Sequence, residues 1–278
     1  MSIKNKIAGS AMLMLAIAII GTGCQKMDRP ALGDYPKDAN PPGGPLKFFA
    51  AYENTNVDSI RANFGSETNV TYVDGVSGKA MKAGTDGYIM YPSANDFKKS
   101  TSFTVAFWMK RDGPNPASGG SAFPFGLSTT QNFWHQMDMF FEFEDAGNPS
   151  SAALASAKFC LRDQWYEFTG ARRIPNLLNN QWHHLAFSFD AATSTISFYV
   201  DGAVPAGLPD GFGKFNNDNG VPDFSKSGGI VVGGAGHYAL GKQPDDWMKN
   251  FNGEIDQFRL YGVALSAAEV KSLYDNKQ

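Results

Sequence analysis

Apolar and polar residues alternate in short runs along most of the chain. In residues 102–110, Phe103, Val105, Phe107 and Met109 recur at every second position. A period of two is typical of a β-strand that buries one face, because successive side chains point to opposite sides. The pattern therefore predicts a strand whose apolar side faces a core.

Similar runs recur at 182–190, 195–200, 230–232 and 255–261, with Gly, Asn, Asp and Pro between them. These intervening residues are typical of turns. The segment 190–194 is short enough for a hairpin loop between its two neighbouring strands. Since no helical pattern links the strands, a parallel α/β sheet is disfavoured. The predicted fold class is all-β, a sandwich or a barrel.

One helix is predicted near the C-terminal end. Ser266 and Glu269 have the spacing of a capping box, in which the serine side chain accepts from the amide three residues on. Val270, Leu273 and Tyr274 then fall on one side of the helix. We expect this short helix to dock on the β-structure.

The N-terminal residues have the pattern of an export signal. Lys4 and Lys6 precede an unbroken apolar run over 11–20, and small residues lead to Cys24. The run is too short to span a bilayer comfortably. The segment resembles a bacterial lipobox, so we expect residues 1–23 to be removed and Cys24 to carry acyl chains. The alternative is an ordinary cleaved signal with an incidental cysteine.

Residues 24–45 are polar and rich in Pro and Gly, which predicts a flexible tether. The folded domain is expected over 46–278. In this interpretation the protein is an exported lipoprotein that reaches the membrane through its lipid anchor only. The expected location is the outer membrane or the cell surface.

Composition supports a folded domain and argues against one class of partner. The chain is 42% hydrophobic and 18% charged, which allows a sizeable core and is not typical of disorder. A net charge of −3 without a Lys/Arg block makes nucleic acid an unlikely partner. If Cys24 is acylated, Cys160 has no disulfide partner, and its apolar surroundings predict a small buried side chain.

Five segments together resemble one family of β-sandwiches. They are Gly78–Met81 with Gly87–Pro92, Phe103–Lys110, Gln181–Ala186, Ile196–Gly202 and Phe251–Glu269. In this order they are similar to the laminin-G-like branch of the concanavalin A-like lectin/glucanase superfamily. The resemblance implies an antiparallel, two-sheet jelly-roll sandwich, often with a structural calcium ion. It gives only a hint about function, since sandwiches host many functions.

The residues themselves give a reason to look for calcium. Asp256 is in phase with Phe258 and Leu260, so regular alternation would turn its carboxylate towards an apolar face. A buried carboxylate needs a partner, and an oxygen-coordinated calcium ion is one. The resemblance implies that an acidic residue near the first strand shares the ion, and Glu53 stands there. The alternatives are a bulge that turns Asp256 outward, or pairing with Arg259 or a backbone amide.

Glucanases of the same architecture require a search for paired carboxylates. Retaining members need two carboxylates about 5 Å apart, and they supply them from alternating acids on one strand. Glu254 and Asp256 alternate, but Phe258 stands where the third acid would be. Glu142 and Glu144 share a strand face, but no third acid stands in phase with them. The sequence therefore contains no complete catalytic motif, and hydrolase activity remains the alternative function.

The four histidines do not form a zinc-binding pattern. His183 and His184 are adjacent, so in a strand they point to opposite faces and cannot ligate one ion together. Both belong to a segment of the sandwich resemblance, and we expect them to be structural. His135 and His237 are predicted in loops, without partners visible in the sequence.

Aromatic residues outside the strand motifs are the candidates for ligand binding. They are Trp134, Trp165, Tyr166, Tyr238 and Trp247. A flat ring with polar neighbours suits the C–H faces of a sugar, although a core position is the commoner fate of Trp and Tyr. Trp108 and Trp182 belong to strand motifs and are expected in the core.

These observations favour a non-catalytic glycan-binding or adhesion lipoprotein that captures polysaccharide at the cell surface. A β-glucanase-like hydrolase on the same fold is the second hypothesis. A protein-binding laminin-G-like module is the third. Turnover of a glycan would single out the enzyme, and a glycan array would separate the first hypothesis from the third.

Overall fold

The structure, a computed structural model, describes residues 43–114, 119–144, 149–215 and 220–277. The predicted export signal, Cys24 and the tether up to residue 42 lie outside these residues. Among the described residues, no helix is long and apolar enough to cross a membrane.

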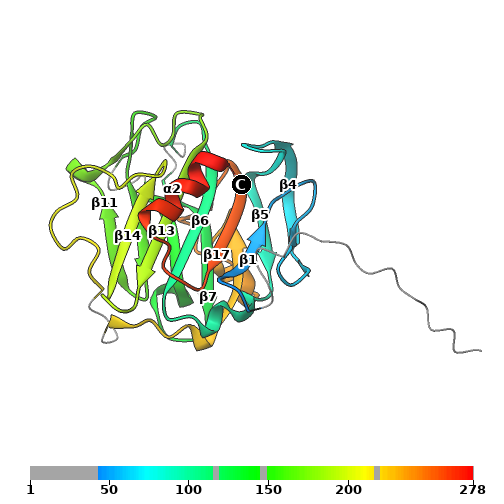
Figure 1. Ribbon diagram of the computed structural model, residues 1–278. Helices are drawn as coiled ribbons and strands as arrows, with labels where there is room; N and C mark the ends of the chain where they lie inside the picture. The colour runs from blue at the N-terminus through cyan, green and yellow to red at the C-terminus, as the bar shows by residue number, and fades with distance from the viewer. Residues whose placement is uncertain (1–42, 115–118, 145–148, 216–219, 278) are drawn as a thin grey trace, which may run out of the picture. The chain divides into compact units, whose positions relative to one another are not determined.

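The strands form two layers (Figure 1). The first, here called the helix-side sheet, has the order β14 (Thr195–Val200), β13 (His183–Asp190), β6 (Phe103–Lys110), β17 (Glu254–Tyr261) and β1 (Leu46–Ala50). The second, here called the opposite sheet, has the order β11 (Gln164–Phe168), β10 (Ala157–Leu161), β8 (Met137–Glu144), β7 (Ser121–Thr129) and β15 (Ser227–Val232). All of these pairings are antiparallel.

The long strand β5 (Lys79–Tyr91) joins the two layers. Its first part pairs with β17 and its last part with β15. Its other edge pairs with β4 (Ser66–Asp74). The predicted all-β sandwich with one short C-terminal helix is confirmed.

Shorter elements complete the sheets and the connections. The strands are β2 (Val57–Asp58), β3 (Asn63–Phe64), β9 (Leu154–Ala155), β12 (Ile174–Pro175) and β16 (Met248–Asn250). The 3-10 turns are η1 (Asn95–Lys99), η2 (Trp134–Gln136), η3 (Gly170–Arg172), η5 (Phe224–Lys226) and η6 (Gly236–Leu240). The strand β16 runs parallel to β7.

The core lies between the two layers, as the alternation predicts. On β6, Phe103, Val105, Phe107 and Met109 are all fully buried in the main apolar cluster. Leu185, Phe187 and Phe189 of β13 lie beside them in register. The segment 190–194 is the predicted hairpin turn between β13 and β14. Cys160 is buried in β10, as expected.

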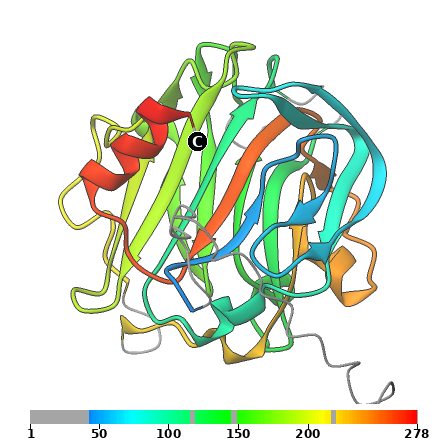
Figure 2. The same cartoon turned by 45° about the vertical axis from the view of Figure 1, so that its right-hand side comes forward.

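The helix α2 (Ala267–Asn276) covers the outer face of the helix-side sheet (Figure 2). Ser266 accepts from the Glu269 amide, and the Glu269 side chain accepts from the Ser266 amide, so the predicted capping box is complete. Val270 packs on Ala106 and Ala186 of the sheet. The outer face of this sheet is therefore buried like a second, smaller core.

The phase predicted for Asp256 is wrong. The pairing of β17 with β6 shifts between Asp256 and Arg259, and Gln257 has a positive φ of 51°. This β-bulge inserts one residue, so Ile255 and Phe258 face the core while Asp256 faces away from it. Asp256 is nevertheless completely buried, because the turn between β4 and β5 covers it.

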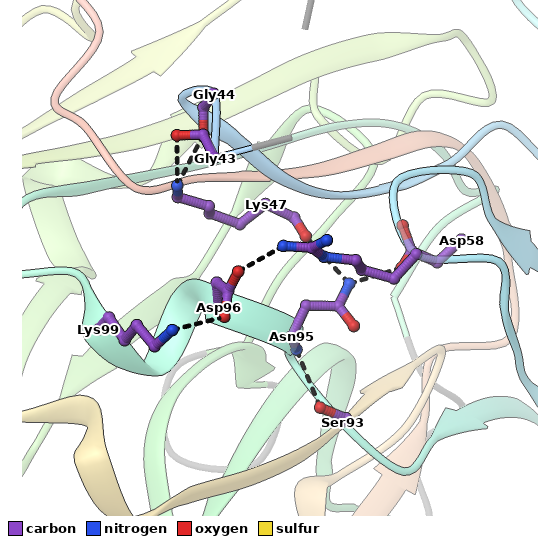
Figure 3. A network of polar contacts seen from close by, with 9 residues as sticks. Gly43, Gly44, Lys47, Asp58, Ser93, Asn95, Asp96 and Lys99 are labelled. Carbon is purple, nitrogen blue, oxygen red and sulfur yellow. Dashed lines mark hydrogen bonds and ion pairs between the residues drawn. The ribbon is translucent and has the colours of Figure 1, made fainter. Parts of the chain in front are cut away.

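A polar network fixes η1 against the start of the domain (Figure 3). Asn95 donates from Nδ2 to the Asp58 carboxylate at 2.6 Å and to the Lys47 carbonyl at 3.0 Å. Asp96 pairs with Arg61 and with Lys99. The completely buried Asp58 also accepts from the Phe49 amide, so β1, β2 and η1 are held together by side-chain hydrogen bonds.

Candidate functional site

Three of the five predicted aromatic residues meet on the outer face of the opposite sheet. Trp134 lies in η2, Trp165 in β11, and Trp247 precedes β16. Their rings are half-buried and pack on a small apolar cluster that is separate from the main core. We call these three side chains the tryptophan cluster. Its apolar base consists of Phe123, Met137, Phe140, Cys160, Ala235 and Met248.

Trp134 is the centre of this cluster. Its ring centroid lies 5.0 Å from that of Trp165 and 5.4 Å from that of Trp247. It also stacks on the buried Phe140 at 5.2 Å. The three tryptophans thus form one aromatic surface although they are more than 100 residues apart in sequence from first to last.

The tight turn between β10 and β11 positions Trp134. Arg162 and Asp163 both have positive φ angles, as a two-residue hairpin of this type requires. The Asp163 carboxylate accepts from the Trp134 amide at 2.7 Å. The Arg162 guanidinium lies 4.3 Å from the Phe133 ring and donates to Gln131. The loop that carries Trp134 is therefore fastened to the neighbouring hairpin.

A buried carboxylate lies behind the same loop. Asp138 is completely buried, and its Oδ2 accepts from the Ser227 hydroxyl at 2.5 Å. Burial raises the pKa of Asp138 to about 6, although Ser227 and Arg162 both act to lower it. Asp138 is therefore inaccessible to a ligand, and it links the turn between β10 and β11 to β15 through Arg162 and Ser227.

Strand geometry positions the other two tryptophans. Trp165 pairs with Cys160 across β10 and β11, and alternation turns both side chains to the outer face. The Trp247 carbonyl accepts from the Ser121 amide at 2.9 Å, just where β16 begins to pair with β7. A Cβ on Gly120 would overlap this carbonyl, and its φ of 104° suits glycine. The backbone of Trp247 is therefore held tightly on the sheet.

The remaining two aromatic candidates have different surroundings. Tyr166 is only 3% exposed and packs in the main core on Phe198, so it does not belong to this surface. The reason is the strand period, because Tyr166 directly follows the outward-facing Trp165. Tyr238 in η6 stacks on Tyr88 with ring centroids 3.8 Å apart.

Tyr238 lines a cleft of about 350 Å³ next to the tryptophan cluster. The cleft is lined by Thr85, Asp86, Gly119, Tyr238, Gln243, Pro244, Asp245, Asp246, Met248, Lys249, Asn250 and Asn252. The Tyr238 hydroxyl donates to Asn250 at 3.3 Å. Most of the polar groups are carboxylates and amides, which suit the hydroxyl groups of a ligand.

His135 joins the cluster to this cleft and His237 lies beside it, although the sequence gives no sign of these contacts. The His135 ring lies 5.5 Å from both the His237 ring and the Trp247 ring. His135 Nδ1 lies 3.5 Å from the Asp245 carboxylate, which lines the cleft. Burial, and then the nearby His135, lower the pKa of His237. Only their positions in neighbouring loops reveal this pair.

The other histidines and tryptophans lie elsewhere. His183 bonds to Asp201 at 2.8 Å and His184 is completely buried under α2, in agreement with structural roles. Trp108 is 2% exposed and lies under α2. The expectation of a core position is wrong for Trp182, which is half-buried ahead of β13.

The carboxylate that the hydrolase hypothesis needs is poorly accessible. Glu142 lies on β8 opposite Lys158 of β10 and is 2% exposed. A general acid must reach the glycosidic oxygen of its substrate, so burial argues against this role. Glu254 pairs with Lys82 and Lys110, and Phe258 is fully buried in the core.

The two residues predicted to hold calcium, Asp256 and Glu53, both accept hydrogen bonds from the turn between β4 and β5. The Asp256 Oδ2 accepts from the Val76 amide at 2.9 Å and from the Ser77 amide at 3.4 Å. The Glu53 Oε2 accepts from the Lys79 amide at 3.0 Å. This outcome contains both alternatives from the sequence, the bulge and the amide pairing.

One observation suits a cation at this turn. The Asp256 Oδ1 is buried and accepts no hydrogen bond within the part of the chain that the structure describes. Burial raises the pKa of Asp256 to about 7, and the charge of Glu53 adds to the rise. A Cβ on Gly78 would overlap the Glu53 carboxylate, so the turn fits closely around it. In the described ranges, no three His, Cys, Asp or Glu side chains converge on one metal position. A bound ion would therefore also need backbone or water oxygens.

The two-layer antiparallel fold places the protein in the class of β-sandwich proteins. A family model described as the concanavalin A-like lectin/glucanases superfamily matches residues 83–271, which is more than half of the chain. The chain therefore belongs to this superfamily. No curated protein sequence matches closely enough to count as a relative.

Solved structures show the same fold at low sequence identity. Domain 4 of AbnA, an extracellular arabinanase from Geobacillus stearothermophilus, was solved with arabinotriose. It is 20% identical with a TM-score of 0.50, and the match covers 82% of this chain and 98% of that one. The binding domain of botulinum neurotoxin DC, in complex with rat synaptotagmin II, is 12% identical with a TM-score of 0.55. A Trypanosoma rangeli sialidase is 16% identical with a TM-score of 0.51.

The extent of these matches limits what they show. The match to the neurotoxin domain covers 84% of this chain and 52% of that one. The match to the sialidase covers 86% of this chain and 35% of that one. At these identities the likeness establishes the fold alone.

Proposed function

We propose that this protein is a non-catalytic glycan-binding module and that the tryptophan cluster is its binding surface. The observation that carries the proposal is that Trp134, Trp165 and Trp247 form a continuous, half-exposed aromatic surface beside a polar cleft. Flat aromatic rings provide apolar contact for the C–H faces of sugars, and nearby polar groups orient the hydroxyls.

Two further features support binding without hydrolysis. The loop that carries Trp134 is fastened by Asp163, so the surface is organised before a ligand arrives. Glu142 is buried beside the surface rather than exposed on it. The solved domain with arabinotriose shows that a protein of this fold has been studied with a bound oligosaccharide.

The test is a glycan array with the purified protein, followed by affinity electrophoresis on the best ligand. We expect Trp134→Ala and Trp165→Ala to weaken retention by about tenfold, since a few aromatic residues carry most of the binding energy. Trp182→Ala is the matched control, because Trp182 is also half-buried but lies outside the cluster. Equal retention of all four proteins would refute the site. Reducing ends released by the protein would refute the non-catalytic interpretation.

We also propose that Glu53 and Asp256 hold a structural calcium ion. Two observations support the proposal: the Asp256 Oδ1 has no hydrogen-bond partner among the described residues, and the pKa of this carboxyl group is raised. A cation would supply the missing partner. An ion bound only by the folded protein stabilises it, by about 2.7 kcal/mol at 100 times its dissociation constant.

Melting curves with calcium and with a chelator test this proposal. We expect calcium to raise the melting temperature of the protein and Glu53→Gln to abolish the response. Asp74→Asn is the control, because Asp74 ends β4 beside the same turn but is 93% exposed. Identical curves with calcium and chelator would exclude a strong site.

The cell-surface location remains a further proposal. It rests on Cys24 and the apolar run before it. We expect labelled palmitate to be incorporated into the wild-type protein and not into Cys24→Ser, and we expect the labelled protein in the outer-membrane fraction. Incorporation into Cys24→Ser, or none into the wild type, would contradict the lipid anchor.

A further inference from the structure

The cleft beside the tryptophan cluster carries an uneven charge. Its lining contains three aspartates, Asp86, Asp245 and Asp246, and one lysine, Lys249. Its other polar side chains are neutral amides, hydroxyls and the phenol of Tyr238. The cleft is therefore negative, and it has the polar groups of a site that accepts hydrogen bonds.

The cleft and the cluster are parts of one continuous surface. Asp245 and Asp246 directly precede Trp247, and Met248 both lines the cleft and packs in the base of the cluster. His135 contacts the Trp247 ring on one side and Asp245 on the other. A chain-like ligand that lies on the tryptophans therefore continues into the cleft.

The walls of the cleft are firmly placed. Asn250 belongs to β16 and is 6% exposed, and its side chain accepts from Tyr238. The Tyr238 ring is in turn stacked on Tyr88 of β5 at 3.8 Å with the planes 7° apart. A volume of about 350 Å³ lies in the range of small-molecule sites, which is about 300–1,000 Å³.

We infer that this cleft is a second subsite, which binds a neutral sugar unit of the polysaccharide held by the tryptophan cluster and excludes acidic glycans. The inference rests on the proposed function and specifies its ligand. Carboxylates and amides accept hydrogen bonds from sugar hydroxyls whether the sugar is neutral or acidic. A uronate or sialate carboxylate in the same place would meet three aspartates and one lysine, so like-charge repulsion weakens its binding.

The test compares two kinds of probe on the full-length protein by calorimetry at low and high salt. The neutral probes are linear arabinan, β-glucan and galactomannan. The acidic probe is polygalacturonate. We expect a neutral probe to bind at least about tenfold more tightly than polygalacturonate at low salt, and the difference to shrink at high salt because ions screen the repulsion.

Variants separate this inference from the proposed function. The double variant Asp86→Asn with Asp246→Asn leaves the His135–Asp245 pair intact. We expect this variant to bind the neutral probe about threefold to tenfold more weakly, because two charged acceptors are lost. We expect it to bind polygalacturonate more tightly than wild type does. Lys249→Gln is the control with the opposite charge change, and it should weaken polygalacturonate further.

The outcomes distinguish the two proposals. Tighter wild-type binding of polygalacturonate than of every neutral probe overturns the neutral subsite. If Trp134→Ala weakens binding of a neutral probe but the double variant binds it as tightly as wild type does, the subsite is overturned. The proposed function would still stand. No binding of any probe, on this panel and on the array, overturns the proposed function itself.

Discussion

The outer faces of the two sheets carry similar residues but differ in what covers them. On the helix-side sheet, Trp108 and His184 are 2% and 0% exposed, because α2 lies across them. On the opposite sheet, the tryptophan cluster and His135 stay partly exposed, and the only α-helix of the described residues, α2, lies on the other sheet. Both faces are aromatic, so composition alone does not distinguish a structural face from a binding face.

The difference shows that tryptophan and histidine can stabilise the fold on one face and form a binding surface on the other. Burial of Trp108 contributes to stability, although its Nε1 and both ring nitrogens of His184 have no hydrogen-bond partner among the described residues. The partly exposed tryptophans contribute less to stability and leave apolar area for a partner. Four predictions test this contrast, from the largest expected effect to the smallest.

The largest effect is expected for Trp108→Ala. Trp108 is almost completely buried and its ring lies 5.5 Å from Tyr274 of α2, so the substitution leaves a cavity. We expect a loss of about 3–5 kcal/mol of unfolding free energy in urea titrations. Trp165→Ala is the comparison from the partly exposed face and should cost well under half as much. Equal losses would show that the two faces are buried alike.

The second effect is an acid sensitivity at the helix-covered face. Burial lowers the pKa of His184 to about 4, and the charge of Arg259 adds to the lowering. The unfolded chain binds this proton near pH 6.5, so stability falls as the pH drops from about 6.5 to 4. The contribution at full effect is about 3 kcal/mol.

The measurement compares wild type and His184→Phe in urea titrations across this pH range. The variant should lack the contribution, so the difference between the two proteins should change with pH. Asp138 and Asp256, whose pKa values are raised, act in the opposite direction but equally in both proteins. A difference that is constant from pH 4 to 7 would contradict a neutral, buried His184.

The third effect concerns the fastening of α2. Ser266→Ala removes the side-chain acceptor of the capping box, which should cost about 1 kcal/mol of unfolding free energy. Glycan binding should be unchanged, because α2 covers the sheet without the tryptophan cluster. Weaker glycan binding by a folded Ser266→Ala protein would show that the two faces are coupled.

The smallest effect on stability is expected at the loop that carries Trp134. Asp163→Gly removes the acceptor for the Trp134 amide and keeps a residue that tolerates the φ of 66°. We expect about a threefold loss in glycan affinity, with a stability loss of only about 0.5 kcal/mol. Asp163→Asn keeps a side-chain oxygen and should bind normally. Identical glycan affinities of wild type, Asp163→Gly and Asp163→Asn would show that binding does not depend on the hydrogen bond from Trp134 to Asp163.

Local patterns in the sequence predict much of the fold because their causes are local. The alternation in β6 and β13 places the right residues in the core, and Ser266 with Glu269 marks the start of α2. The tryptophans themselves could be selected as candidates because they fall outside regular strand motifs. Tyr166 could not be separated from Trp165, since the exact phase of β11 was not evident from its sequence.

The sequence by itself determined the strands β6, β13, β14, β15 and β17, the helix α2 and the superfamily resemblance, because strand period and helix capping depend on near neighbours. The tertiary structure decided which distant loops meet. It brought Trp134, Trp165 and Trp247 together and set His135 beside Asp245. It also turned Asp256 away from the core through one inserted residue at Gln257, under a turn 180 residues earlier in the chain. Contacts between distant segments depend on the registers of whole sheets, and one bulge changes a register without leaving a periodic signal in the sequence.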